Sequence, residues 1–284
     1  MRSWSDVWGA FLRQLKKEPR VAWLGVLGVG LGALCAGVGL LAGFQVPPEG
    51  SLWETATFNG AVGIYLLTLA ALAPETGISA KGQRRWAWAL VPPTVYSYGI
   101  ETVQAFRGLD PRFSAVAGPL DQALGGLFLL AALVIMVLFL VLAWKFFTAE
   151  TTPLRIGVRY ASVAALISFG VGIFMSIQNG RVIGAEGNLL LIHGAGFHGL
   201  QAVPLVALFL AWGRVDQERA RAWVHLAGVA WVGLCAAVLG QAVAGIAPTA
   251  LTQSTVAAVV LFGGWAATAV VSIRAWRRPS TAPA

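Results

Sequence analysis

The most apolar stretch of the chain, QALGGLFLLAALVIMVLFLVLAW at residues 122–144, contains no charged side chain. A helix needs about 20 apolar residues to cross the hydrocarbon core of a bilayer, whereas a barrel strand needs about 10. Because lipid offers no hydrogen bonds to the backbone, a run of this length predicts a membrane-spanning helix. The fold therefore depends on how many such runs the chain contains.

Seven further runs accompany this one, and together they predict eight spans. The predicted spans are 21–44, 53–73, 86–106, 122–144, 160–178, 189–212, 223–245 and 252–273. The weakest two are 86–106, which contains Glu101, and 223–245, which begins with a Trp and a His near the membrane surface. The sequence therefore predicts an all-α polytopic membrane protein, an eight-helix bundle.

The composition of the 284 residues agrees with this prediction. Hydrophobic residues make up 57% of the chain, charged residues only 11%, and the mean hydropathy is +0.73. A soluble domain carries about 25% charged residues, so a water-soluble fold, intrinsic disorder and a disulfide-rich secreted domain are excluded. The net charge of +8 is spread over several predicted cytoplasmic segments, so we expect the lipid bilayer, and no nucleic acid, as a partner.

The basic residues predict the orientation in the membrane. With the N-terminus in the cytoplasm, 17 of the 20 basic residues fall on the cytoplasmic side, and Arg107, Arg112 and Arg181 fall on the other. The positive-inside rule then places both termini in the cytoplasm of a bacterial-type inner membrane. The first apolar run is too long for the apolar region of a signal peptide and lacks an obvious cleavage site, so we expect no cleavable signal peptide.

The chain divides into four predicted parts. Residues 1–20 carry apolar side chains at helical spacing and predict an amphipathic helix on the cytoplasmic membrane surface or, alternatively, a helix docked on a partner subunit. Residues 21–148 and 154–276 form two predicted tandem four-helix repeats, and residues 277–284 form a cytoplasmic tail. An even number of helices per repeat gives both repeats a parallel orientation, with a site expected at their interface.

Two alignments support this internal repeat. FNGAVGIYLLTL (58–69) matches FHGLQAVPLVAL (197–208), which is an offset of 139 in residue number. QAFRGLDP (104–111) matches QAVAGIAP (241–248), which is an offset of 137. Chance similarity between helices rich in Ala, Leu, Val and Gly is the alternative, but composition alone does not repeat the matched Gln and Pro positions.

The alignments make polar positions of the two halves equivalent. The equivalences are Glu54 with His193, Asn59 with His198, and Gln104 with Gln241. The polar positions coincide while their chemistry differs, which is expected of one asymmetric site built from a duplicated bundle.

Ionisable groups within spans are energetically costly, and they are the first candidates for functional residues. Besides Lys and Arg at helix ends, the spans contain Glu54, Glu101, His193, His198 and His225. We interpret His225 as an interfacial anchor, because it begins a span on the cytoplasmic side. The other four lie in the outer half of the membrane in the predicted orientation, and they predict an outward-facing pocket.

Span 86–106 carries one continuous polar stripe on its helix. Its members, at i, i+3, i+4, i+7 and i+10, are Thr94, Ser97, Tyr98, Glu101 and Gln104. Lipid does not tolerate such a stripe, so it should face the bundle interior or a water-filled cavity. The alternative to a functional site is a set of interhelical hydrogen bonds, with Glu101 neutralised by Arg107 or by protonation.

Span 189–212 contains HGAGFHGLQ, from His193 to Gln201. On a straight helix His193 and His198 lie about 140° apart, so they are poorly placed to bind one metal ion without local unwinding, although they can line one cavity. The alternative is packing histidines with internal hydrogen bonds. Further residues expected to bind substrate or to support ligands are Asn59, Tyr98, Gln104, Arg107, Asn179, Arg181, Gln201 and Gln241.

Three classes of function follow from these residues. The first is a redox or metal-assisted membrane enzyme with Glu101 and His198 as catalytic groups. Its cofactor is Fe, Zn or Cu, or a haem with a single His ligand, and its metal ligands are His193, His198, Glu101 and Glu54. The second is a transporter or channel for protons, cations or a small polar substrate, with Glu101 and the His pair as a relay. The third is a non-catalytic membrane subunit or assembly factor.

The four-plus-four layout is similar to that of the haem A synthase family, which is also built from duplicated four-helix units. That family places its haem-binding histidines on several helices, whereas His193 and His198 share one span here. The resemblance therefore implies an architecture, and it assigns no residue of this chain.

Overall fold

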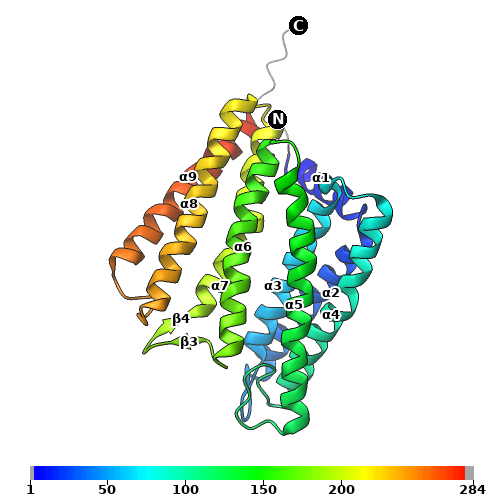
Figure 1. Ribbon diagram of the computed structural model, residues 1–284, viewed down its shortest axis with the longest axis vertical. Coiled ribbons are helices and arrows are strands. Elements are labelled where there is room, and N and C mark those ends of the chain that lie inside the picture. Colours follow the sequence, from blue (N-terminus) through cyan, green and yellow to red (C-terminus); the bar gives the residue numbers. More distant parts are fainter. Residues whose placement is uncertain (1–2, 279–284) are drawn as a thin grey trace. The chain divides into compact units, whose positions relative to one another are not determined.

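The computed structural model describes residues 3–278, and this part of the chain is almost entirely helical (Figure 1). Seven helices are long and apolar enough to cross a membrane. They are α2 (Pro19–Ala42), α3 (Leu52–Leu72), α5 (Pro119–Thr148), α6 (Pro153–Ile177), α7 (Leu189–Trp212), α8 (Gln217–Val243) and α9 (Gln253–Arg277). The chain is therefore a helical multi-pass membrane protein. Residues 279–284 of the predicted tail lie outside the described residues.

Helix α4 (Ala80–Phe106) matches the eighth predicted span but is not among these seven, since polar residues lower its hydropathy. Every member of its polar stripe is buried: Thr94, Ser97, Tyr98, Glu101 and Gln104. The prediction that this stripe faces the interior is confirmed. The helix continues through Pro92 and Pro93.

The chain folds as two compact units, whose long helices and hairpins follow the same order. The N-terminal unit, Trp8–Lys145, contains α2, the hairpin β1 (Gln45–Val46) and β2 (Gly50–Ser51), then α3, the short 3-10 helix η1 (Ala73–Thr76), α4 and most of α5. The C-terminal unit consists of the chain from Phe146 onward together with the first residues up to Val7, and after the end of α5 it contains α6, the hairpin β3 (Val182–Ile183) and β4 (Gly187–Asn188), then α7, α8 and α9.

The N-terminal helix α1 (Trp4–Leu15) confirms that residues 1–20 contain a helix. Its first residue, Trp4, belongs to the C-terminal unit and packs edge-on against Phe209 of α7 and Trp276 of α9, with ring centroids 5.9 and 4.8 Å away. Its placement on a membrane surface stays a prediction.

Helices α2 and α3 pack with their backbones in contact. A Cβ atom placed on Gly63 of α3 would lie 2.6 Å from the backbone nitrogen of Val29 and 2.7 Å from the carbonyl oxygen of Gly25, both on α2. Small residues permit such approach in membrane bundles, where dispersion replaces the hydrophobic effect as the main attraction. Tyr98 of α4 reaches the same contact and donates a hydrogen bond to the carbonyl of Leu24, 3.3 Å away.

Helix α5 is held differently, by long side chains instead of close backbones. Trp86 of α4 donates from Nε1 to the carbonyl of Leu138 at 2.9 Å, and Tyr96 donates from Oη to the carbonyl of Leu124 at 2.6 Å. The side chains keep the backbone of α5 farther from α4 than that of α2 is from α3.

The close contact of α2 and α3 predicts different outcomes for two glycines on the same helix. Gly63→Ala should lower the free energy of unfolding by about 1–3 kcal/mol, because the new methyl group meets backbone atoms. Gly60→Ala is the matched control, since a Cβ there has open space and alanine favours the helix. Thermal unfolding of the detergent-solubilised protein measures both. Equal stability of the two variants would contradict the packing described here.

Candidate functional site

Each unit is closed at one end by its hairpin and by the loop that follows the third helix of its four-helix set. We call this the hairpin end. Its backbone hydrogen bonds recur in both units at an offset of 137 in residue number: Glu49 N to Gly108 O (2.8 Å), Glu186 N to Gly245 O (3.1 Å), Leu52 N to Phe44 O (2.8 Å) and Leu189 N to Arg181 O (3.0 Å). Gly108 and Gly245 both have positive φ angles, 81° and 71°, which glycine adopts without strain.

The helix starts fix the register between the units. Ser51 caps α3 and Asn188 caps α7, and these two residues have the same offset in number as the hydrogen bonds. In this register Glu54 corresponds to Leu191, Asn59 to Gly196 and Gln104 to Gln241. Only the last of the three predicted equivalences agrees with it. The match of 58–69 with 197–208 is displaced from this register by two positions.

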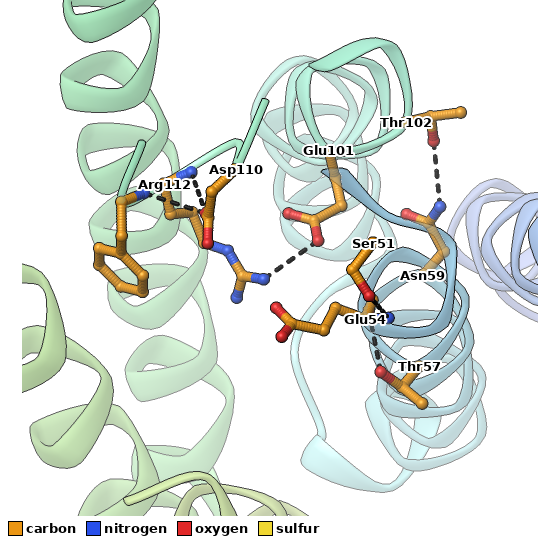
Figure 2. Close-up of polar contacts among 9 residues, drawn as sticks. Ser51, Glu54, Thr57, Asn59, Glu101, Thr102, Asp110 and Arg112 are labelled. Atoms are coloured by element: carbon orange, nitrogen blue, oxygen red, sulfur yellow. Dashed lines mark hydrogen bonds and ion pairs between the residues drawn. The ribbon is translucent and has the colours of Figure 1, made fainter. Parts of the chain in front are cut away.

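Glu101 is the centre of the polar cluster at the hairpin end of the N-terminal unit. Its side chain is 0% exposed, and its Oε1 lies 3.1 Å from the Nη2 atom of Arg112 (Figure 2). The alternative in which Arg107 neutralises Glu101 is wrong, because Arg107 pairs instead with Asp121 at 2.6 Å. Arg112, which was not among the predicted site residues, is the counter-ion of Glu101.

The Arg112 guanidinium is surrounded by aromatic rings as well as by carboxylates. Its Cζ atom lies 5.2 Å from the ring centroid of Phe58, 5.9 Å from that of Phe113 and 6.0 Å from that of Phe128. These distances fit cation–π interactions. Figure 2 shows the Glu54 carboxylate directed toward the same guanidinium from the first turn of α3.

Buried oxygen atoms line the neighbouring interior. Asn59 is 0% exposed and donates from Nδ2 to the hydroxyl of Thr102 at 3.0 Å. Within residues 3–278, its Oδ1 atom and the hydroxyl oxygens of Thr55 and Thr94 are buried without a hydrogen-bond partner. A buried polar atom without a partner costs about 1–3 kcal/mol, so these three oxygen atoms are exceptions among the buried polar groups.

The loop of residues 107–118, here called the cap loop, directs Arg112 inward. Asp110 accepts hydrogen bonds at Oδ1 from the backbone N–H groups of Arg112 (2.9 Å) and Phe113 (3.0 Å). Glu49, in the hairpin, accepts from the Ser114 hydroxyl and from the N–H of Ala115 at 2.9 Å. The Ser114 hydrogen bond is the main reason why the pKa of Glu49 lies below its ordinary value of 4.5.

Gln104 and Arg107 fasten α4 to the start of α5. Gln104 donates from Nε2 to Asp121 at 2.8 Å, while its Oε1 accepts from Arg107. Arg107 also bonds both carboxylate oxygens of Asp121, and its side chain is 51% exposed. These two predicted site residues therefore belong to an interhelical clamp beside the Glu101 site.

The two predicted site histidines lie on α7 in different environments. The Nδ1 atom of His193 donates to the carbonyl of Ser168 at 2.8 Å, and its ring packs edge-on against Phe197, with the centroids 5.1 Å apart. His198 is exposed on the surface of its unit, and its Nδ1 lies 3.4 Å from Oε1 of Gln201. His193 and Glu101 belong to separate units, so a pocket that combines them stays a prediction.

The remaining predicted residues support the fold of the C-terminal unit. Asn179 has a left-handed φ of 53° in the turn before β3, and the carbonyl of Arg181 accepts from α7. Gln241 accepts from the hydroxyls of Thr252 and Thr255 and so closes the loop between α8 and α9. In the described part of the chain no three His, Cys, Asp or Glu residues are grouped to hold a metal ion. Metal and haem binding stay predictions.

Comparison of the chain with protein-family models, curated proteins and solved structures finds no match.

The buried ion pair predicts a non-additive response to mutation. Arg112→Ala should destabilise the protein by about 3–5 kcal/mol, because it leaves the Glu101 carboxylate buried without its counter-ion. The double variant Arg112→Ala/Glu101→Gln removes that charge and should recover much of the loss. Thermal unfolding in detergent of the wild type, the two single variants and the double variant measures the coupling between the two residues. Additive effects of Arg112→Ala and Glu101→Gln would contradict a coupled pair.

The lowered pKa of Glu49 predicts a pH-dependent contribution of the cap loop. Ionised Glu49 stabilises the fold fully above pH 4.5, and this stabilisation is lost as the pH falls through its lower folded-state pKa. The wild type should therefore unfold at a higher temperature than Glu49→Gln at pH 7, with a difference that shrinks below pH 4.5. Glu186→Gln, at the equivalent hairpin position, controls for general charge loss. A difference that is constant with pH would contradict this role.

Proposed function

We propose that the chain is a bacterial inner-membrane protein with eight spans, two tandem four-helix repeats in parallel orientation, and both termini in the cytoplasm. The 27 residues of α4 extend about 40 Å, and its polar side is buried, so it can cross a bilayer. The shared element order and the hydrogen bonds that recur in both units support duplication. The excess of basic residues supports the orientation, which puts the hairpin ends on the outer side.

Within this architecture, the function that the geometry supports best is cation transport, with Glu101 as the binding group. The observation that carries the proposal is the guanidinium of Arg112, which sits between a fully buried carboxylate and three aromatic rings. The carboxylate and the aromatic rings that bind the Arg112 guanidinium have the chemistry to bind a free cation in its place. Because the Arg112 side chain comes from a loop and is 17% exposed, it can leave without unwinding a helix.

The charges around Arg112 favour an additional cation. Two carboxylates, Glu54 and Glu101, are directed at one guanidinium (Figure 2). Carboxylates at this position have the chemistry to bind an ammonium- or guanidinium-type cation. A cation that binds Glu101 would compete directly with Arg112.

The polar stripe of α4 provides the next part of a route for a cation beyond Glu101. It extends about 15 Å along α4 from Gln104 to Thr94, roughly half the thickness of the hydrocarbon core. Toward the other end of α4 the buried residues are Leu90, Ala87 and Trp86, and these are apolar. A polar stripe that ends about halfway along its helix favours a transporter over a continuous channel.

Chemical rescue tests whether the site binds a cation. In Arg112→Gly the side chain is removed, and millimolar guanidinium should raise the unfolding temperature by restoring a counter-ion to Glu101. Sodium at equal ionic strength is the control for screening, and Arg112→Gly/Glu101→Gln is the control for the carboxylate. Rescue that is equal with sodium, or that persists in the double variant, would contradict a cation site.

A flux assay tests transport itself. Proteoliposomes of the wild type should show uptake of protons or labelled guanidinium that depends on pH and is abolished by Glu101→Gln. Glu186→Gln, which neutralises an exposed carboxylate, should retain the flux. Wild-type flux no greater than that of protein-free liposomes, or equal flux in Glu101→Gln, would overturn the proposed function.

A further inference from the structure

The hairpin end of the C-terminal unit contains a cavity of about 240 Å³ between α7, α8 and α9. Its walls are mainly apolar, and they include Leu191, Leu234, Val238, Val259 and Phe262. Val259 and Phe262 are 66% and 49% exposed on α9, one of the seven apolar helices. The cavity therefore adjoins the surface that α9 presents to the bilayer.

The polar side chains at the cavity are engaged within the protein. Gln241 accepts from Thr252 and Thr255 at 3.0 and 2.6 Å and donates to the carbonyl of Ala247 at 2.6 Å. Asn188 accepts from the N–H of Leu190 at the start of α7. A buried water needs two to four polar partners, so this cavity suits hydrocarbon better than water.

The cavity occupies the position that the charged cluster has in the N-terminal unit. In the register set by the hairpin hydrogen bonds, Leu191 corresponds to Glu54 and Val238 to Glu101. When the first residues of α5 and α9, Pro119 and Gln253, are aligned, Phe262 corresponds to Phe128. The same place in two similar units thus has carboxylates and an arginine in one, and Leu, Val and open space in the other.

We propose that this cavity binds one acyl chain of a bilayer phospholipid. Its volume is below the range of about 300–1,000 Å³ that is usual for ligand pockets, which favours a single narrow chain over a bulky ring system. The exposed apolar residues of α9 give a chain direct access from the membrane. This inference rests on the cavity and does not depend on cation transport at Glu101.

Photo-crosslinking in vesicles tests the assignment. Wild-type protein is reconstituted with phosphatidylcholine that carries a diazirine on one acyl chain, and labelled peptides are identified by mass spectrometry. The α8 segment with Leu234 and Val238 should be labelled. Ala258→Trp, which places a large ring at the cavity wall, should lose most of this label, whereas Val270→Trp, on the exposed surface of the same helix, should keep it.

A second filling variant, Val238→Phe, should also lose the label, and thermal unfolding verifies that each variant is folded. An unlabelled Leu234–Val238 segment in the wild type, or labelling that is unchanged in folded filling variants, would overturn the proposal. A diazirine-bearing free fatty acid is tested in parallel. Labelling of the segment by the fatty acid but not by the phospholipid would overturn the assignment to phospholipid.

Discussion

The buried ion pair between Glu101 and Arg112 constrains the whole hairpin end of the N-terminal unit. Removing two charges from water costs several kcal/mol each, and their attraction offsets this cost only when the geometry is held closely. The helix fixes Glu101, but Arg112 lies in a loop and needs separate support. The Asp110 turn and the Glu49 contacts to the cap loop provide it. The hairpin thus helps to position Arg112 through its hydrogen bonds to the cap loop.

The C-terminal unit has the same hairpin backbone as the N-terminal unit but lacks the charged cluster. Its hairpin makes the same backbone hydrogen bonds, including that of Glu186 with Gly245, although Val238 stands where the N-terminal unit has Glu101. The framework therefore forms without an ion pair to support. It is a stable way to join antiparallel helices, on which either a charged cluster or an apolar cavity can be built. Residues at equivalent positions of the two units thus differ in charge and size while the backbone framework stays the same.

Periodicity and hydropathy predicted the helices and the burial of the α4 stripe, because both depend on spacing within one segment. The partner of Glu101 was not predictable in this way. Arg107 is closer in sequence, but the turn made by Asp110 brings Arg112 inward while Asp121 holds Arg107. The signal that could have identified it is Asp-Pro-Arg-Phe, an aspartate that can bond the backbone two residues ahead. The alignment of 58–69 with 197–208 gave the wrong register at the start of α7 because it matched side chains, whereas the caps of α3 and α7 fix the helix starts.

In the proposed transport Arg112 would leave Glu101, and the packing of the N-terminal unit indicates which part could move with it. Helices α2 and α3 meet through glycine backbones, and a shift there would break many atomic contacts at once. Helix α5 is held through the long side chains of Trp86 and Tyr96, which can follow a small displacement by rotating. The cap loop leads directly into α5, and the Asp121 clamp joins that helix to Arg107. Movement of α5 would therefore carry the cap loop with it, and it would have to break the hydrogen bonds of Asp121 to Gln104 and Arg107 at the same time.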